Sequence, residues 1–192
     1  MLAAEVCVVA GPRSIGKTRF IDHGPALGDR LPALLRAHFE SRPPVVPIVG
    51  LHRQAEASHP RATVHADIYA PFDRLPTLSE ERLTAELTAA KYAATVEFAS
   101  LAQAKRLLVV TLHAPRKVVL QRWLDRLAAD QQRLARGNLA RIYSDASGDR
   151  LLERLYAAWY GFLATLPRAQ CWQADVADDS AMKLASQGVQ AG

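Results

Sequence analysis

Residues 11–18 read Gly11-Pro12-Arg13-Ser14-Ile15-Gly16-Lys17-Thr18 and match the pattern G-x-x-x-x-G-K-[ST]. They follow directly on Val6-Cys7-Val8-Val9-Ala10, an apolar run without the alternation of a half-exposed strand. Such a run is typical of a central parallel strand that is covered on both faces. The apolar residues Phe20 and Ile21 come next, where a helix would bury them. The stretch therefore predicts a buried strand, a P-loop at its carboxyl end and a helix that begins in the loop.

The predicted loop has the chemistry of a phosphate site. Its backbone N–H groups and the positive end of the following helix point to the same place. Lys17 adds a mobile ammonium, and the Thr18 hydroxyl can hold Mg²⁺. We therefore expect ATP, or another nucleoside triphosphate, and Mg²⁺ as ligands. The candidate nucleotide-binding residues are Gly11, Pro12, Arg13, Ser14, Ile15, Gly16, Lys17 and Thr18.

Length and composition indicate one soluble α/β domain over residues 1–192. A chain of 192 residues can bury a full core, and a hydrophobic content of 49% is ordinary. There is no run of eighteen apolar residues, and the first predicted strand leaves no room for a signal peptide after Met1. We expect a cytoplasmic protein, in the host cytoplasm if a phage encodes it, with no membrane partner. Cys7 and Cys171 are expected to be small buried thiols.

The positive charge is concentrated in one segment. Residues 116–141 contain seven Lys or Arg and two Asp, an excess that equals the formal net charge of +5 for the whole chain. Such a stretch favours a phosphate-bearing partner, either a nucleotide or a nucleic-acid backbone. The alternative is a solvated helix face rich in arginine.

Apolar periodicity predicts alternating strands and helices. Strands are expected at 6–10, 45–49, 62–69, 107–112 and 170–174, and the tail beyond 178 is expected to hold a short helix. A capping box at 77–80 indicates one long helix to about 104, while residues 137–148 look like a loop before a helix at 151–166. The pattern indicates a doubly wound, mainly parallel five-stranded α/β sheet with helices on both faces. Its ligand site would lie at the carboxyl ends of the strands.

Three stretches together resemble the P-loop kinases, the group that contains nucleoside and nucleotide kinases. They are the loop at 11–18, the strand-to-helix passage from Leu107 to Arg122, and the arginine-bearing segment after it. The resemblance implies an Arg-rich lid at about 122–148 that closes over the phosphates. It also implies a charge-stabilising role for five residues, which are Lys17, Arg122, Arg126, Arg133 and Arg136.

A hydroxyl acceptor also needs a carboxylate to take or orient its proton. Asp67, at the end of a predicted strand, is our candidate for this base, or for a Mg²⁺ ligand acting through water. An ordinary strand-end Asp capping a turn is an equally good interpretation. Asp22 is a weaker rival that is expected to face away from the site.

Other side chains near these positions remain open between function and structure. Basic residues could bind an acceptor or simply reflect the composition of a surface loop: His52, Arg53, Arg61, His65 and Arg74. Aromatic residues could stack on a base or fill the core: Trp123, Tyr156, Trp159 and Tyr160. Core is the favoured interpretation for Trp159, which recurs at helical spacing.

The function expected from the sequence is an ATP-dependent kinase. The compact basic chain, with a pI near 9.5, is similar to bacteriophage kinases that phosphorylate 5-hydroxymethyluracil within DNA, so that base is the favoured acceptor. The alternatives are a kinase of a free nucleoside, nucleoside monophosphate or other small metabolite, and a regulatory module that only binds a nucleotide. Asn-Lys-x-Asp and Leu-Ser-Gly-Gly are absent from the sequence, which disfavours a signalling GTPase and a transporter ATPase. The oligomeric state is open.

Overall fold

Strand β1 (Glu5–Gly11) lies inside the sheet and is buried along its whole length. In the computed structural model, the described residues are 4–51, 60–73, 75–129, 138–144, 146–166, 168–177 and 183–187. The other strands are β2 (Val45–Pro47), β3 (Arg61–Asp67), β4 (Arg106–His113), β5 (Ala169–Asp175) and β6 (Lys183–Gln187). They form a six-stranded sheet in the order β2-β3-β1-β4-β5-β6, and only the β5–β6 pair is antiparallel.

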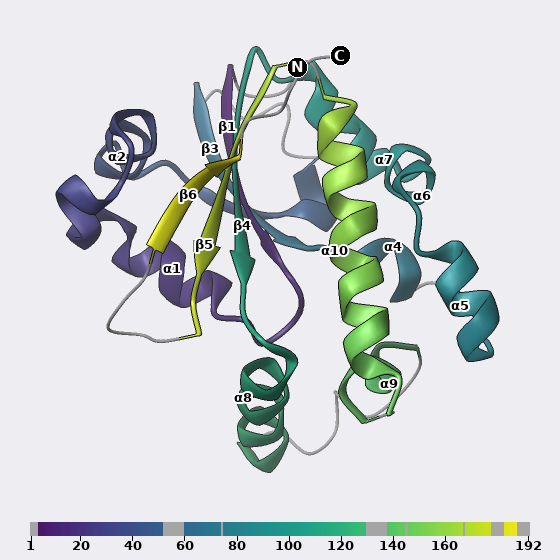
Figure 1. Cartoon of the computed structure of the whole chain (residues 1–192). Coiled ribbons are helices and arrows are strands. Elements are labelled where there is room, and N and C mark those ends of the chain that lie inside the picture. Colours follow the sequence, from purple (N-terminus) through teal and green to yellow (C-terminus); the bar gives the residue numbers. More distant parts are fainter. Residues whose placement is uncertain are drawn as a thin grey trace.

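Helices cover both faces of this sheet (Figure 1). On one side lie α1 (Lys17–His23), η1 (Gly24–Arg30) and α2 (Ala33–Glu40). On the other lie α4 (Ala70–Asp73), α5 (Glu80–Glu86), α6 (Ala89–Ala93), α7 (Val96–Ala99), η3 (Ser100–Gln103) and α10 (Gly148–Ala164). The short η2 (Ile48–Gly50) follows β2, whereas α8 (Arg116–Ala129) and α9 (Asn138–Ser144) lie beyond the carboxyl end of β4.

The topology places the beginning of the loop at residues 11–18 at the point where the strand order reverses. From β1 the chain builds β2 and β3 on one side and β4, β5 and β6 on the other. In such sheets a ligand crevice forms outside the carboxyl ends of the strands at this point. Gly11 at the end of β1 pairs in register with Asp67 at the end of β3. The sequence-predicted α/β sheet is therefore confirmed in its mainly parallel, doubly wound form.

An aromatic cluster packs α10 against α6, α7 and the sheet. Trp159 is 0% exposed, its ring meets those of Tyr92 and Phe98, and its Nε1 donates to Thr111 Oγ1 at 2.9 Å. Tyr156, on the same helix, is buried and donates to the Leu112 carbonyl at 3.0 Å. The favoured core interpretation of Trp159 is confirmed.

Two sequence predictions about the sheet and its helices were wrong. The sheet has six strands because residues 183–187, in the tail that was expected to hold a short helix, form β6 and pair with β5. The expected long helix to 104 is divided into α5, α6, α7 and η3, because Leu87, Thr88 and Thr95 leave helical dihedral angles. The first of these helices begins at Glu80, where Ser79 and not Thr77 is the N-cap and accepts from Arg82 N at 3.3 Å. These breaks let Leu87, Tyr92 and Phe98 all reach the core.

Two further details differ from the prediction. Residues 138–144, expected to be loop, form α9, because buried Asn138 accepts from Leu78 N at 2.8 Å and donates to Pro76 O at 3.0 Å. The strand expected at 45–49 ends at Pro47 and continues as η2. Cys7 and Cys171 are free and buried, as expected.

A buried carboxylate ties together the sheet's other end, away from the loop. Glu5 Oε1 lies 2.8 Å from His38 Nδ1 and 3.3 Å from Arg61 Nε, and Glu5 Oε2 lies 3.1 Å from Arg106 Nη1. Burial raises the pKa of Glu5. The hydrogen bonds from His38 and Arg106, together with the neighbouring positive charge, lower it by more, so the pKa of Glu5 is lower than that of an ordinary Glu. This cluster joins β1, α2, β3 and β4.

Candidate functional site

Residues 11–18 form a loop that curls between β1 and α1. Ile15 N donates to the Pro12 carbonyl at 3.4 Å, and Ser14 and Gly16 have left-handed backbone angles, with φ of 64° and 106°. Such angles turn successive backbone amides toward one side, as in anion-binding nests. A Cβ on Gly11 would lie 2.9 Å from Ile15 Cγ2 and 3.3 Å from the Leu112 carbonyl, so the loop also needs glycine for close packing.

The side chain of Lys17 is enclosed by this loop. Lys17 is 4% exposed, and its Nζ donates to the carbonyls of Gly11 at 2.9 Å and Pro12 at 2.8 Å. Burial lowers its pKa to about 8; Asp67 opposes that shift and the charges of Arg13 and Arg126 add to it. The loop thus holds a desolvated ammonium against neutral carbonyl oxygens.

Ser14 supplies a second buried polar group at the loop. The residue is 8% exposed, and its Oγ has no hydrogen-bond partner among the described atoms. A buried hydroxyl in that condition is costly, and a ligand oxygen would satisfy it. Ser14 and Lys17 both line the cavity described next.

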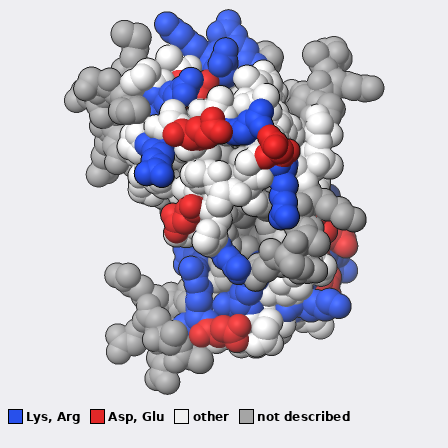
Figure 2. Space-filling view, turned by 90° about the vertical axis from the view of Figure 1, so that its left-hand side faces the viewer, with Lys and Arg blue, Asp and Glu red and all other residues white. Residues whose placement is uncertain are grey.

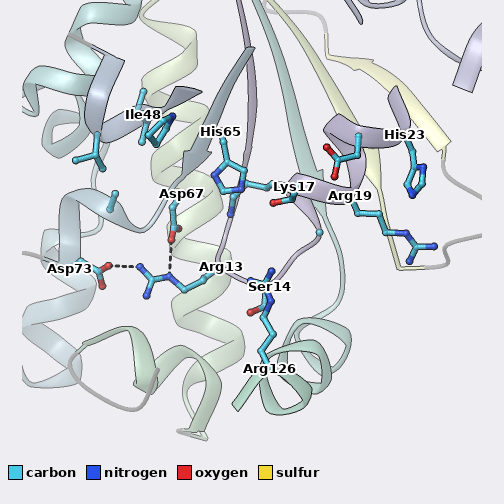
Figure 3. Close-up of a pocket in the computed structure, with 16 residues that line it drawn as sticks. Arg13, Ser14, Lys17, Arg19, His23, Ile48, His65, Asp67, Asp73 and Arg126 are labelled. Carbon is cyan, nitrogen blue, oxygen red and sulfur yellow. Dashed lines mark hydrogen bonds and ion pairs between the residues drawn. The ribbon is translucent and has the colours of Figure 1, made fainter. Parts of the chain in front are cut away.

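A cavity of about 840 Å³ opens in front of the loop (Figure 3). One side is formed by the loop and α1, including Thr18, and Arg126 reaches it from α8. The opposite side comes from β2, η2, β3 and α4, and its lining residues are Pro47, Ile48, Val49, His65, Asp67, Ala70 and Asp73. Asp22 also lines the cavity, so the expectation that it faces away was wrong.

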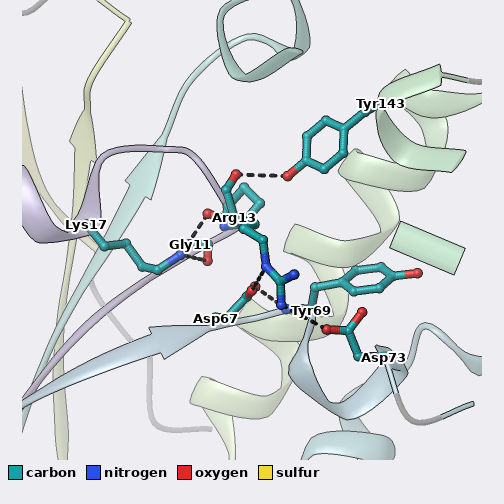
Figure 4. Close-up of polar contacts among 8 residues, drawn as sticks. Gly11, Arg13, Lys17, Asp67, Tyr69, Asp73 and Tyr143 are labelled. Atoms are coloured by element: carbon teal, nitrogen blue, oxygen red, sulfur yellow. Dashed lines mark hydrogen bonds and ion pairs between the residues drawn. The ribbon is translucent and has the colours of Figure 1, made fainter. Parts of the chain in front are cut away.

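Asp67 lies where the sequence predicted, at the strand end beside the loop, and it is already engaged (Figure 4). Its Oδ1 accepts from Tyr69 N at 3.1 Å, and its Oδ2 accepts from Arg13 Nε at 3.2 Å. Arg13 Nη2 reaches onward to Asp73 Oδ2 at 3.1 Å. Burial raises the pKa of Asp73; Arg13 opposes that shift and Asp67 adds to it. Burial also lowers the pKa of His65, and the charge of Lys17 adds to that effect.

The arginines expected in a lid have different surroundings. Arg122 donates to the carbonyls of Ile15 at 2.9 Å and Val176 at 2.8 Å, so it braces the loop and is not a lining residue of the cavity. Arg126 is exposed and does line it. Arg141 donates to the Leu78 carbonyl at 2.5 Å. Arg133 and Arg136 lie outside the described residues, as do His52, Arg53 and Arg74, while Arg61 belongs to the Glu5 cluster.

Helices α8 and α9 pack together through two stacked rings, and one of these rings contacts the loop. Trp123 of α8 and Tyr143 of α9 lie 4.9 Å apart at 16°, and Tyr143 Oη donates to the Arg13 carbonyl at 2.8 Å. Trp123 is only 6% exposed. Its ring thus packs α8 against α9, and the alternative that it stacks on a base gains no support.

Sequence reasoning missed Asp73 and the bridging role of Arg13. Arg13 occupies a position where the loop pattern accepts any residue, and Asp73 stands in a stretch without periodicity. The only signal for Asp73 was its place shortly after a predicted strand end, on the same rim as the loop.

Basic side chains gather at both ends of the face shown in Figure 2, with acidic ones among them. The lower end is the end at which α8 lies in Figure 1. No helix among the described residues is long and apolar enough to cross a membrane. Comparisons of this protein with protein-family models, with curated proteins and with solved structures found no match.

Proposed function

We propose that this protein is a kinase that transfers the γ-phosphate of ATP, or of another nucleoside triphosphate, to a hydroxyl of a nucleoside-type acceptor. The observation that carries the proposal is the buried Lys17 ammonium inside a curled loop, with Asp67 on the same rim of one cavity. Phosphoryl transfer needs charge stabilisation and positioning more than covalent chemistry. Lys17 supplies the first, and Asp67 is suited to hold the acceptor hydroxyl.

The loop fits a triphosphate. Lys17 would exchange its two bonds to neutral carbonyls for bonds to phosphate oxygens, which are stronger because both partners are charged. Ser14 Oγ would gain the partner that it lacks. Among the described arginines of the expected lid, Arg126 lines the cavity and would contact the phosphates.

The residues also fit Mg²⁺ that arrives with the nucleotide. No group of three or more His, Cys, Asp or Glu in the described part of the chain could hold a metal ion by itself. Mg²⁺ commonly uses only one or two protein ligands, together with phosphates and water. Thr18 would be one of those ligands, and the ion would neutralise charge on the transferred group. Asp67, if it does not serve as the base, is the alternative second ligand and would act through water.

The favoured acceptor is the hydroxymethyl group of 5-hydroxymethyluracil in DNA. The basic surplus between 116 and 141 supports a polyanionic partner, and the cavity has room for a base turned out of the duplex. A free nucleoside, a nucleoside monophosphate and another small metabolite are the alternative acceptors. A regulatory module would bind the nucleotide and transfer nothing.

The test is incubation with γ-labelled ATP and Mg²⁺ against a panel of free nucleosides, nucleoside monophosphates, plain DNA and hydroxymethylpyrimidine DNA. We expect label on one acceptor class. Asp67→Asn should lower transfer by at least about 100-fold while ATP affinity changes little. Asp29→Asn is the matched control, because the Asp29 side chain is 97% exposed and away from the cavity lining. Normal transfer by Asp67→Asn would remove Asp67 from its proposed role, and ATP binding without transfer to any acceptor would favour the regulatory module.

A further inference from the structure

Two carboxylates joined by one guanidinium form part of the cavity surface. We name Asp67, Arg13 and Asp73 the acidic wall, and we propose that it is the acceptor subsite and takes an alcohol whose reacting end carries no phosphate. The inference rests on the proposed kinase function and adds the charge class of its acceptor. It separates acceptors such as a nucleoside or a turned-out base, which react through an alcohol, from a nucleoside monophosphate.

The position of the acidic wall matches the side from which an acceptor must approach. Lys17 and Ser14 would hold the donor phosphates on the loop side. An acceptor attacks the terminal phosphoryl group in line, opposite the leaving diphosphate. The cavity continues from the loop to the side formed by β2, η2, β3 and α4, where Asp67 and Asp73 lie (Figure 3). An acceptor seated there would place its hydroxyl between the wall and the donor.

The charge of this side disfavours a phosphate on the acceptor. The described lining residues from β2, η2, β3 and α4 include no Lys or Arg. Arg13, which extends from the loop, already donates to both carboxylates. With both carboxylates ionised, the acidic wall has a net charge of −1, and a phosphate placed close to it would meet like charge in a partly desolvated site.

The same wall suits hydroxyl and N–H donors. An ionised carboxylate offers about four lone-pair sites, and the hydrogen bonds described above leave some of them for a ligand. The side chains of Asp67 and Asp73 are 17% and 35% exposed, so a ligand in the cavity can reach them. Pro47, Ile48 and Val49 add an apolar surface on the same side, which would pack against a planar base.

The experiment measures binding of a matched pair of acceptors to the full chain saturated with a non-hydrolysable Mg-ATP analogue, which fills the position of the γ-phosphate. The probes are 5-hydroxymethyl-2′-deoxyuridine and the monophosphate ester of its 5-hydroxymethyl group, so the two differ only in a phosphate on the reacting end, and calorimetry gives both dissociation constants. We expect the nucleoside to bind at least about tenfold more tightly than its monophosphate. Initial rates with ATP should show the same order.

Variants of Asp73 test the cause of that preference. Asp73→Asn removes one negative charge and should reduce the preference roughly tenfold, whereas Asp73→Glu should retain it. Asp29→Asn, a charge change outside the cavity, should leave it unchanged. Because the measurement is a ratio within each variant, a general loss of stability does not imitate the result.

Three outcomes would overturn the inference: tighter or equal binding of the monophosphate to the wild-type chain, an unchanged preference in Asp73→Asn, or no binding of either probe. Selective loss of monophosphate binding on Arg53→Ala or Arg74→Ala would show that these arginines hold an acceptor phosphate, and would also overturn it. Failure of the kinase proposal looks different, because either the nucleotide analogue itself would not bind, or ATP would bind and no acceptor of the panel would receive label.

Discussion

Replacing Arg122 tests whether this arginine holds the loop or the nucleotide. Its guanidinium connects Ile15 in the loop with Val176 after β5, through hydrogen bonds of 2.9 and 2.8 Å. Hydrogen bonds from a charged group contribute about 1.5–3 kcal/mol each. Taking the lower value for this half-buried side chain, Arg122→Ala should lower the free energy of unfolding by about 3 kcal/mol without any nucleotide.

Urea denaturation of the nucleotide-free chain measures this loss. With a slope of about 2 kcal/mol per molar urea, the midpoint should fall by roughly 1.5 M. Arg126→Ala is the matched control, because Arg126 is exposed on the same helix and lines the cavity. It should change stability by less than about 0.5 kcal/mol and lower the rate of transfer instead. If the Arg122→Ala chain is as stable as the wild type but defective in transfer, the bracing role is refuted. Arg122 would then bind the nucleotide phosphates, as the resemblance to kinases implied.

Three other sites carry predictions: Lys17 in the loop, the buried Glu5 at the other end of the sheet, and Tyr143, which contacts the loop. Nucleotide affinity should fall above pH 8, because Lys17 has a pKa lowered to about 8 and must then take up a proton to bind phosphate. Calorimetry at pH 9, in buffers of different ionisation enthalpy, detects the uptake of that proton. The same shift should make the free protein gain stability between pH 8 and 10.5, where only the unfolded chain keeps the proton. Glu5→Gln should cost about 3 kcal/mol in urea denaturation at pH 7. In the wild type the Glu5 contribution is present above pH 4.5 and should disappear as the pH falls through its lowered pKa. Tyr143→Phe should cost about 1 kcal/mol and speed hydrogen exchange of the loop amides, since the Arg13 carbonyl loses its partner.

The central strands and the loop could be predicted because their signals are local. The apolar runs of β1 and β4 can only be buried on both faces, and the loop pattern dictates its own glycines. Asp67 could be placed because a strand end fixes the rim on which a residue lies. These elements needed no knowledge of distant partners.

The remaining elements depend on contacts far along the chain. Leu87 and Phe98 satisfy helical periodicity, yet the extended Thr88 and Thr95 between them allow a better fit to the core than one straight helix. The Arg122 side chain could not be placed, because its partner Val176 lies 54 positions away. Asp73 belongs to the site only through Arg13, a contact across 60 positions.

The two outer strands of the sheet, β2 and β6, limit aggregation of the chain through its sheet edges. An unpaired strand edge is a template for pairing with another molecule, and such pairing leads to aggregation. At one margin β2 is only three residues long and ends at Pro47, which limits that hazard. At the other margin β6 covers β5, whose Cys171 and Trp172 are almost fully buried. A chain truncated before Lys183 would expose the edge of β5 from Cys171 to Asp175, and intermolecular strand addition at that margin is the expected result.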